Sequence, residues 1–163
     1  MQLGDVLEKH KQVFISSDDI YEHIHWHKEK FKNMANVCPK LRDRIIVLNG
    51  VSKAYSMTGW RIGYAAGNKE VIKKMKTLQS QSTSCASSIS QAAACTALSS
   101  ECKELPLMTA EYKKRHDYVV SKLNEIPGVT CKETDGTFYV FPSFIKYIDC
   151  LLYTSPSPRD VEE

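Results

Sequence analysis

The sequence contains no run approaching the roughly 18 apolar residues that a membrane-spanning helix requires, which argues against a membrane protein. Its six cysteines lie far apart with no Cys-x-x-Cys pair, so they predict reduced thiols in a cytoplasmic compartment, not a disulfide framework or a zinc knuckle. The net charge is only +3 and the basic residues are scattered, a pattern that argues against nucleic acid as a partner. The opening residues, with one apolar pair and early acidic residues, do not resemble a secretory signal.

The proportions of hydrophobic and charged residues are typical of a soluble globular protein. The chain has 163 residues, 42% of them hydrophobic and 25% charged, enough to bury a core without disulfides or metals. His23, His25 and His27 alternate, but no acidic or cysteine residue recurs beside them at ligand spacing. We therefore expect no metal site.

Short apolar strands alternate with helical patterns along the chain, which predicts an α/β fold. We expect strands over residues 13–16, 44–48, 61–67 and 137–141, and helical segments over residues 3–10, 68–78, 88–98 and 106–123. The charged residues 26–40 predict a surface loop that stops at Pro39. Only about a dozen residues separate the second and third strands, too few for a helical crossover, so these two strands should be antiparallel neighbours.

Residues 151–163 break the pattern, with Pro156 and Pro158 among serines and no apolar period. One interpretation is a disordered terminus. The other, which we favour, is translated adapter sequence of the kind found on the ends of unrelated gene fragments, with the native carboxyl end missing. Residues 151–163 therefore do not enter the prediction of the fold.

Lys53 follows the apolar strand 44–48 and precedes Thr58-Gly59 by five residues and Arg61 by eight. Ligands bind at the carboxyl edge of α/β sheets, so a lysine at this place is positioned to meet a cofactor. A lone lysine in a loop is more often a solvated surface charge. The residues around Lys53 are therefore needed to distinguish a cofactor lysine from a surface lysine.

That segment, NGVSKAYSMTGWRIGYAAG over residues 49–67, resembles the pyridoxal-phosphate lysine segment of the class I aminotransferases, most closely the aspartate aminotransferase branch. Residues 17–24, 83–94 and 135–143 resemble further segments of the family in the same order. The resemblance runs from about Val13 to Ser143. It implies the fold type I architecture of pyridoxal-phosphate-dependent transferases.

The resemblance implies a role for three residues at the reactive end of the cofactor. Lys53 would bind the cofactor aldehyde through its amine and, once released, carry a proton from the substrate α-carbon. Asp18 would pair with the protonated pyridine nitrogen. Asp19 is the alternative to Asp18, but the family places this acid three residues before the tyrosine. Tyr21 would hydrogen-bond the cofactor hydroxyl.

The same resemblance gives two candidate residues for binding the phosphate of the cofactor. Arg61 matches the arginine whose planar guanidinium can form two parallel hydrogen bonds to a dianion. Ser52 is the second candidate. An arginine in a surface ion pair is the alternative interpretation for Arg61.

For the whole protein, the resemblance implies a transaminase that moves an amino group from an amino acid, with aspartate expected, to a 2-oxo acid. The parent protein would be a cytoplasmic homodimer with pyridoxal 5′-phosphate as cofactor. An aminotransferase of the aromatic, alanine or kynurenine type and a non-catalytic remnant are the alternatives. No N-P-x-N-P-T-G segment precedes Asp18, and the arginine that would hold the substrate carboxylate is not reached, so we expect the chain alone to be inactive.

The resemblance and the order of the expected elements together predict how the chain divides into domains. Residues 1–127 would form the C-terminal part of the large cofactor-binding domain, and residues 128–150 the start of the small domain. Pro127-Gly128 marks the expected boundary, and residues 151–163 the tail.

Overall fold

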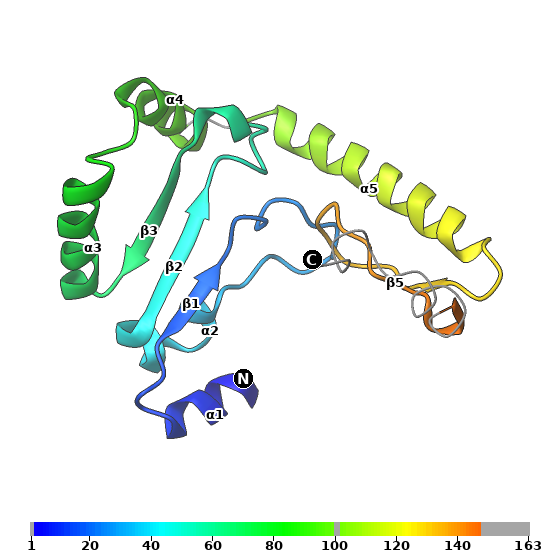
Figure 1. Ribbon diagram of the computed structural model, residues 1–163, viewed down its shortest axis with the longest axis horizontal. Coiled ribbons are helices and arrows are strands. Elements are labelled where there is room, and N and C mark those ends of the chain that lie inside the picture. The colour runs from blue at the N-terminus through cyan, green and yellow to red at the C-terminus, as the bar shows by residue number, and fades with distance from the viewer. Residues whose placement is uncertain (1, 100–101, 148–163) are drawn as a thin grey trace, which may run out of the picture.

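A three-stranded mixed sheet lies at the centre of the computed structural model, which describes residues 2–99 and 102–147 (Figure 1). The strand order is β1 (Ile15–Asp18), β2 (Ile45–Gly50) and β3 (Gly63–Gly67). β1 pairs with β2 in parallel, and β2 pairs with β3 antiparallel. The antiparallel pairing expected from the short connection is therefore confirmed.

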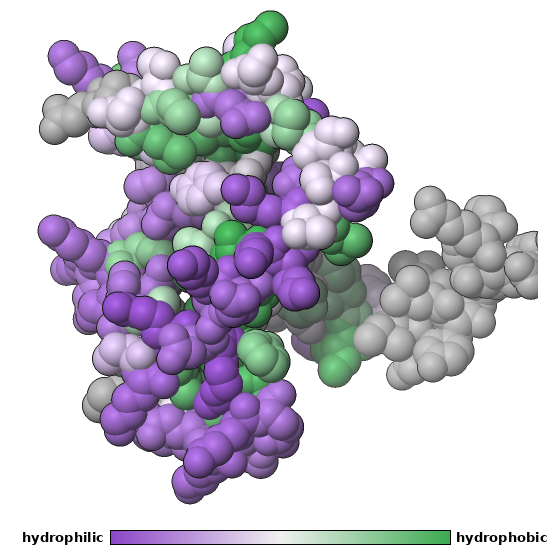
Figure 2. All heavy atoms as spheres, turned by 90° about the vertical axis from the view of Figure 1, so that its left-hand side faces the viewer, coloured by the Kyte–Doolittle hydropathy of each residue, from purple (hydrophilic) through white to green (hydrophobic). Residues whose placement is uncertain are grey.

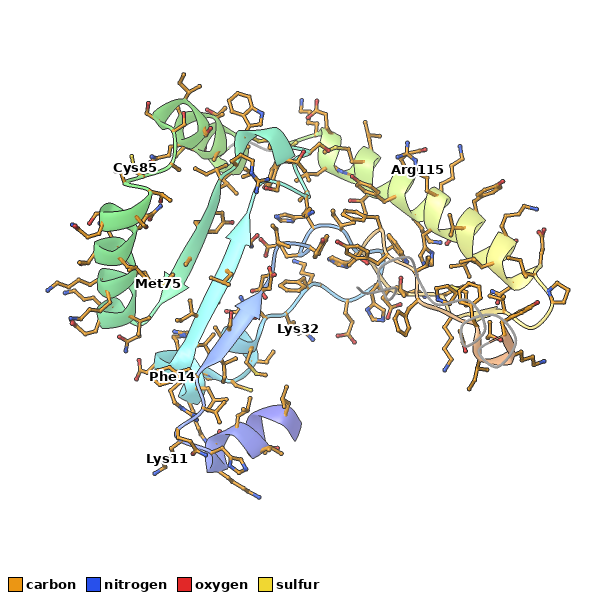
Figure 3. The ribbon with its side chains drawn as sticks, in the orientation of Figure 1. Lys11, Phe14, Lys32, Met75, Cys85 and Arg115 are labelled. Atoms are coloured by element: carbon orange, nitrogen blue, oxygen red, sulfur yellow. The ribbon has the colours of Figure 1, made fainter. Side chains whose placement is uncertain are left out.

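The first strand lies two residues later than the sequence predicted. Ile15 pairs with Ile45, whereas Phe14 stays exposed just before the strand (Figure 3). β3 also begins later, at Gly63, and ends where its backbone comes close to β2. A Cβ on Gly67 would lie 2.8 Å from the Ile45 carbonyl oxygen, so only glycine allows this approach.

The amino-terminal part of the chain forms α1 (Gln2–Lys9), as its amphipathic pattern predicts. The loop expected over residues 26–40 is interrupted by α2 (Met34–Val37), because the Asn33 side chain caps that turn by accepting from Asn36 N at 2.9 Å. Pro39 does not stop this segment but begins the 3-10 helix η1 (Pro39–Arg44). Its fixed φ and missing N–H suit the first position of a helix.

Three longer helices follow the sheet. α3 (Lys69–Ser82) starts after the predicted cap, Asn68, whose side chain accepts from Glu70 N at 2.9 Å, and it packs beside β3 with Met75 on the facing side (Figure 3). α4 (Ser88–Ser99) matches its prediction. α5 (Glu104–Asn124) begins two residues before Pro106, which is tolerated in the first turn of a helix.

The late strand predicted over residues 137–141 is wrong. Beyond α5 the chain forms only β4 (Thr130–Cys131), β5 (Pro142–Ser143) and the 3-10 helix η3 (Ile145–Tyr147). Thr137 has φ +67° and its N–H donates to Ile24 O at 2.8 Å, so this stretch docks on the loop after β1. Its aromatic side chains pack together and do not alternate across a sheet.

The core of the described part is small. The most deeply buried apolar side chains are Ile24, Leu41, Ile45 and Val51. Across residues 2–99 and 102–147, no helix combines the length and apolarity needed to cross a bilayer. The predicted tail, residues 151–163, lies outside the described residues, and the domain boundary near Pro127 stays a prediction.

Candidate active site

The carboxyl ends of β1 and β2 meet at one edge of the sheet, because the two strands are parallel. β1 ends at Asp18, and the next residue donates its backbone N–H to Leu48 O at 2.9 Å. β2 ends at Gly50, and Lys53 stands in the turn that follows. The sheet thus brings Asp18 and Lys53 to the same edge from segments that are 35 residues apart in the chain.

Lys53 is half-buried, and its amine lies near two aromatic rings. Its Nζ lies 5.9 Å from the centroid of the Tyr21 ring and 5.6 Å from that of Phe138. Ring faces at this distance attract a charged ammonium group. The structure therefore places the lysine and the tyrosine of the sequence prediction side by side.

Tyr21 is held by other aromatic residues. Its hydroxyl oxygen lies 2.7 Å from that of Tyr139, and its ring meets Phe138 edge-on at 5.5 Å. Burial, the hydrogen bond to Tyr139 and the nearby Asp18 carboxylate together raise the pKa of Tyr21 from 10.0 to about 12, with burial as the largest cause. Tyr21 therefore keeps its proton at neutral pH and can act as a hydrogen-bond donor.

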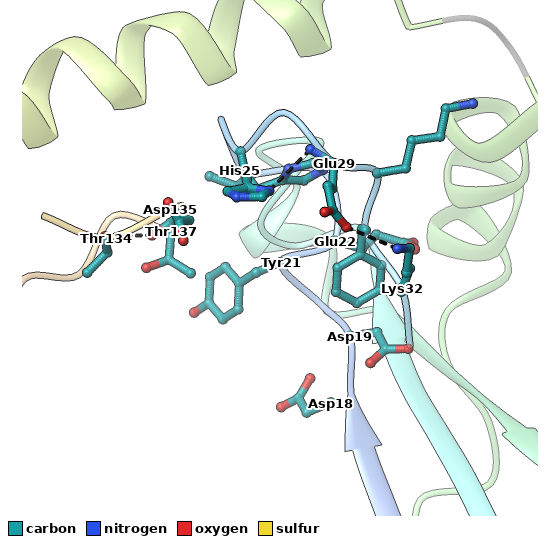
Figure 4. A pocket seen from close by; sticks show the side chains of 15 residues that line it. Asp18, Asp19, Tyr21, Glu22, His25, Glu29, Lys32, Thr134, Asp135 and Thr137 are labelled. Atoms are coloured by element: carbon teal, nitrogen blue, oxygen red, sulfur yellow. Dashed lines mark hydrogen bonds and ion pairs between the residues drawn. The ribbon is translucent and has the colours of Figure 1, made fainter. Parts of the chain in front are cut away.

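The two neighbouring aspartates differ in direction and burial. Figure 4 shows the Asp18 carboxylate and the Tyr21 hydroxyl on one side of the end of β1, with Asp19 turned to the other side. Asp18 is exposed, whereas Asp19 is only 5% exposed and accepts a hydrogen bond from Ser17 Oγ at 2.7 Å. The other Asp19 oxygen is buried without a partner among the described residues. Asp18 is thus the acid that shares an open side with Tyr21.

Arg61 lies farther along the same loop and is not brought into contact with this group. It follows the short helix η2 (Thr58–Trp60) with φ +51°, and its Nη1 donates to Thr58 O at 2.9 Å. Ser56, in the same loop, also has a positive φ of 54°. Non-glycine residues in this conformation store strain, which collects at functional sites. Within the described ranges, the remaining nitrogens of the exposed Arg61 guanidinium carry no hydrogen bond.

Ser52 lies directly before Lys53 and is half-buried. Its hydroxyl has no hydrogen-bond partner in the part of the chain that the structure describes. The preceding residue, Val51, is fully buried and anchors this end of the loop.

A hollow of about 580 Å³ opens beside the end of β1 (Figure 4). Its walls include Asp18 and Tyr21, the segment 27–32 and the turn 134–137. Lys53 does not line it and reaches Tyr21 from the loop after β2. The hollow therefore includes Asp18 and Tyr21 but leaves out Lys53, so it covers only one side of the candidate site. In residues 2–99 and 102–147, no three His, Cys, Asp or Glu side chains are grouped to bind a metal ion.

The sequence interpretation missed Phe138 and Tyr139 as members of this site. Their segment was recognised only as family-like, and its apolar residues were assigned to a strand. Two adjacent aromatic residues after Asp135-Gly136 were the available signal, but nothing local indicates that they pack on Tyr21, which is distant in the sequence. An amine, a protonated phenol and a carboxylate meet at one sheet edge, and these three groups fit the aldehyde, the hydroxyl and the ring nitrogen of pyridoxal phosphate.

Solved structures share this arrangement of elements. The aspartate aminotransferase of Rhizobium meliloti superposes with a TM-score of 0.82 at 48% identity, over 85% of this chain and 34% of that one. The aromatic aminotransferase of Pyrococcus horikoshii OT3 gives 0.80 at 32% identity, over 86% and 38%. The architecture is part of a fold type I pyridoxal-phosphate-dependent transferase, as the sequence implied.

The aminotransferase class I and II family model matches residues 1–150, and the chain belongs to that family. The aspartate/prephenate aminotransferase of Cereibacter sphaeroides (strain ATCC 17029 / ATH 2.4.9) is 52% identical over 140 residues, 86% of this chain and 35% of that protein. A probable aspartate/prephenate aminotransferase of Rhizobium leguminosarum bv. phaseoli is 46% identical over 160 residues, 98% and 39% of the two chains. The chain thus spans little more than a third of the length of these relatives.

Proposed function

We propose that this chain carries the lysine segment of a pyridoxal-phosphate-dependent transaminase that moves an amino group from an amino acid to a 2-oxo acid. The observation that supports this most directly is the meeting of Lys53, Tyr21 and Asp18 at one edge of the sheet. Family membership supports the same reaction class.

Each of the three residues has a distinct task. When bound, pyridoxal phosphate supplies an aldehyde for an amine and a ring that withdraws electrons. The Lys53 amine holds the cofactor and, when free, moves a proton from the α-carbon of the amino acid. The Tyr21 hydroxyl donates a hydrogen bond to the cofactor hydroxyl oxygen. The Asp18 carboxylate favours a protonated ring nitrogen by its charge.

The phosphate is proposed to bind to the loop after β2. Arg61 offers guanidinium N–H groups that are exposed, and Ser52 offers a hydroxyl next to Lys53. A guanidinium can meet a phosphate with two parallel hydrogen bonds, which makes Arg61 the stronger partner of the two.

We propose aspartate as the amino donor, because the similar proteins named above are called aspartate or aspartate/prephenate aminotransferases. An aromatic substrate is the alternative, since one similar structure is that of an aromatic aminotransferase. The parent protein is proposed to be a homodimer. The cysteine spacing supports the cytoplasm as its location. The chain alone is proposed to bind the cofactor without completing the reaction.

Borohydride trapping tests the cofactor assignment. The chain is incubated with pyridoxal phosphate, reduced, digested and analysed by mass spectrometry, and we expect a pyridoxyl group on Lys53 in preference to other lysines. Lys53→Arg should lose this label, whereas Lys122→Arg, at an exposed lysine paired with Glu125 on α5, should keep it. A label spread evenly over surface lysines, or unchanged in Lys53→Arg, would refute the proposal.

A further inference from the structure

The hydroxyl of Tyr21 has a partner that no residue of the lysine segment supplies. Its oxygen lies 2.7 Å from the hydroxyl oxygen of Tyr139, and the two rings meet edge-on at 5.7 Å. The two tyrosines are 118 residues apart in the sequence. The contact therefore exists only because the stretch after α5 returns to the edge of the sheet.

The backbone holds Tyr139 in this place. Gly136 lies so close to the loop after β1 that a Cβ on it would be 2.6 Å from Ile24 O. The next residue donates its N–H to the same carbonyl oxygen at 2.8 Å, and Tyr139 N donates to the Thr137 hydroxyl at 3.3 Å. Two hydrogen bonds in succession thus connect the loop after β1 to Tyr139.

Burial of the ring does not explain the choice of tyrosine at position 139. The residue is 55% exposed, so its side chain adds little to the core. Its neighbour Phe138 already packs on Tyr21 and lies 5.6 Å from the Lys53 amine. A phenylalanine at position 139 would make the same ring contacts, and only the hydroxyl bond to Tyr21 would be lost.

We propose that Tyr139 is a positioning residue of this site, whose hydroxyl bonds the Tyr21 hydroxyl and holds it beside Lys53, where it can meet an oxygen of the bound cofactor. This inference rests on the proposed function. The groups that face Tyr21 are Asp18 from β1, Lys53 from the loop after β2 and Tyr139 from the stretch after α5. Besides burial, the bond to Tyr139 contributes to the pKa of about 12 of Tyr21.

The test compares Tyr139→Phe, Tyr21→Phe and the double variant, each loaded with pyridoxal phosphate. The first readout is the pH at which the absorbance of the bound cofactor changes, and the second is borohydride labelling of Lys53. Loss of the Tyr21 donor should raise the pH midpoint, because the cofactor oxygen loses a hydrogen bond that favours its anion. Tyr139→Phe should raise it by about 0.5–1 pH unit, and the double variant should match Tyr21→Phe.

Tyr112→Phe is the matched control. The Tyr112 ring stacks on Phe138 at 5.5 Å, but its hydroxyl is not bonded to Tyr21, so this variant should keep the wild-type midpoint. A second measurement uses the chain without cofactor. The tyrosinate absorbance of wild type minus Tyr21→Phe reports Tyr21, whose pKa should fall from about 12 toward 10.0 in the Tyr139→Phe background.

The outcomes separate the two proposals. If wild type gives no label on Lys53, the proposed function fails and this inference falls with it. If Lys53 is labelled but Tyr139→Phe keeps both the wild-type midpoint and the wild-type Tyr21 pKa, only the role of Tyr139 is refuted. Independent, additive effects of the two substitutions would also refute it, because Tyr139 would then not act through Tyr21.

Discussion

A single buried histidine connects the longest helix to the turn 134–137, which leads to Tyr139. His116 on α5 is 4% exposed, and its Nε2 accepts from Thr134 N at 3.2 Å. Its Nδ1 then carries the proton and lies 3.1 Å from an Asp117 carboxylate oxygen. Trp26 packs on the imidazole at 5.0 Å and donates from Nε1 to Thr134 O at 2.8 Å. His116 thus helps to hold the turn 134–137 against the loop after β1.

We predict that His116→Ala lowers the free energy of unfolding by about 2 kcal/mol, because it leaves the half-buried Thr134 N–H without its acceptor and a gap beside Trp26. Urea denaturation of the dilute chain, followed by tryptophan fluorescence, measures the loss. His10→Ala is the control, since His10 is exposed and only its backbone is used by a neighbour. Equal midpoints for the two variants would contradict the role assigned to His116.

At the same scale, local sequence singled out three of the residues that the fold brings to this edge of the sheet and missed the others. Lys53, Tyr21 and Asp18 belong to short segments whose residue types and spacing carry the prediction. The preference for Asp18 over Asp19 agrees with the geometry, because neighbouring residues of a strand point to opposite faces. Tyr139 could not be predicted, since its bond to Tyr21 depends on how the chain returns after α5.

At the scale of elements, α1 is connected to the sheet by one guanidinium. Arg44, the residue before β2, donates from Nη1 to His10 O and Val13 O, each at 2.8 Å, and from Nη2 to Leu7 O at 2.9 Å. These carbonyl groups lie at and beyond the end of α1, where Leu7 O and His10 O also accept from the backbone N–H groups of His10 and Val13. One side chain therefore caps the helix and fixes the chain that leads into β1.

Arg44→Lys should release this end of α1, because an ammonium group cannot reach three separated carbonyl oxygens as a planar fork does. We expect amide hydrogen exchange in α1 to become about tenfold faster, while β2 and β3 keep their protection. Arg42→Lys, at an exposed position of the same short helix, is the matched control. Unchanged exchange in α1 would show that Arg44 does not hold it.

The elements themselves were largely predictable where the pattern is local. The cap at Asn68 and the helical periods of α3 and α4 need only neighbouring residues. The strand expected over residues 137–141 failed because its apolar residues find partners far away, in Tyr21 and in Tyr112 of α5. A run of apolar residues predicts that a segment is packed against something, but it does not predict which part of the chain the segment packs on.

For the molecule as a whole, the described part exposes much apolar surface. Phe141 is 93% exposed, and Leu78 on α3, Ile89 on α4 and Leu107 on α5 are each more than 70% exposed. Figure 2 shows hydrophobic side chains gathered at the end of the molecule near α4, whereas hydrophilic ones cover most of the rest of that face. Surface of this kind promotes association unless something covers it.

We predict that the purified chain associates in a concentration-dependent way and binds a hydrophobic dye, because exposed apolar residues lie on several helices. Analytical ultracentrifugation measures the association. The double variant Leu78→Ser and Ile89→Ser should reduce it, whereas Thr77→Ser, beside Leu78 on α3, should not. A monomer with a sharp cooperative melt at high concentration would contradict this prediction.

The chain alone was enough to single out Lys53 as the proposed cofactor lysine and to predict the α/β alternation and the antiparallel return after β2, because all of these depend on residues close together in sequence. The surroundings of that lysine could not be predicted in this way. The hydroxyl pair of Tyr21 and Tyr139 and the aromatic faces around the Lys53 amine arise from contacts across up to 118 residues. Local patterns encode which elements form and where they end, but the contacts between distant segments depend on how the whole chain packs, and no short stretch of sequence contains that information.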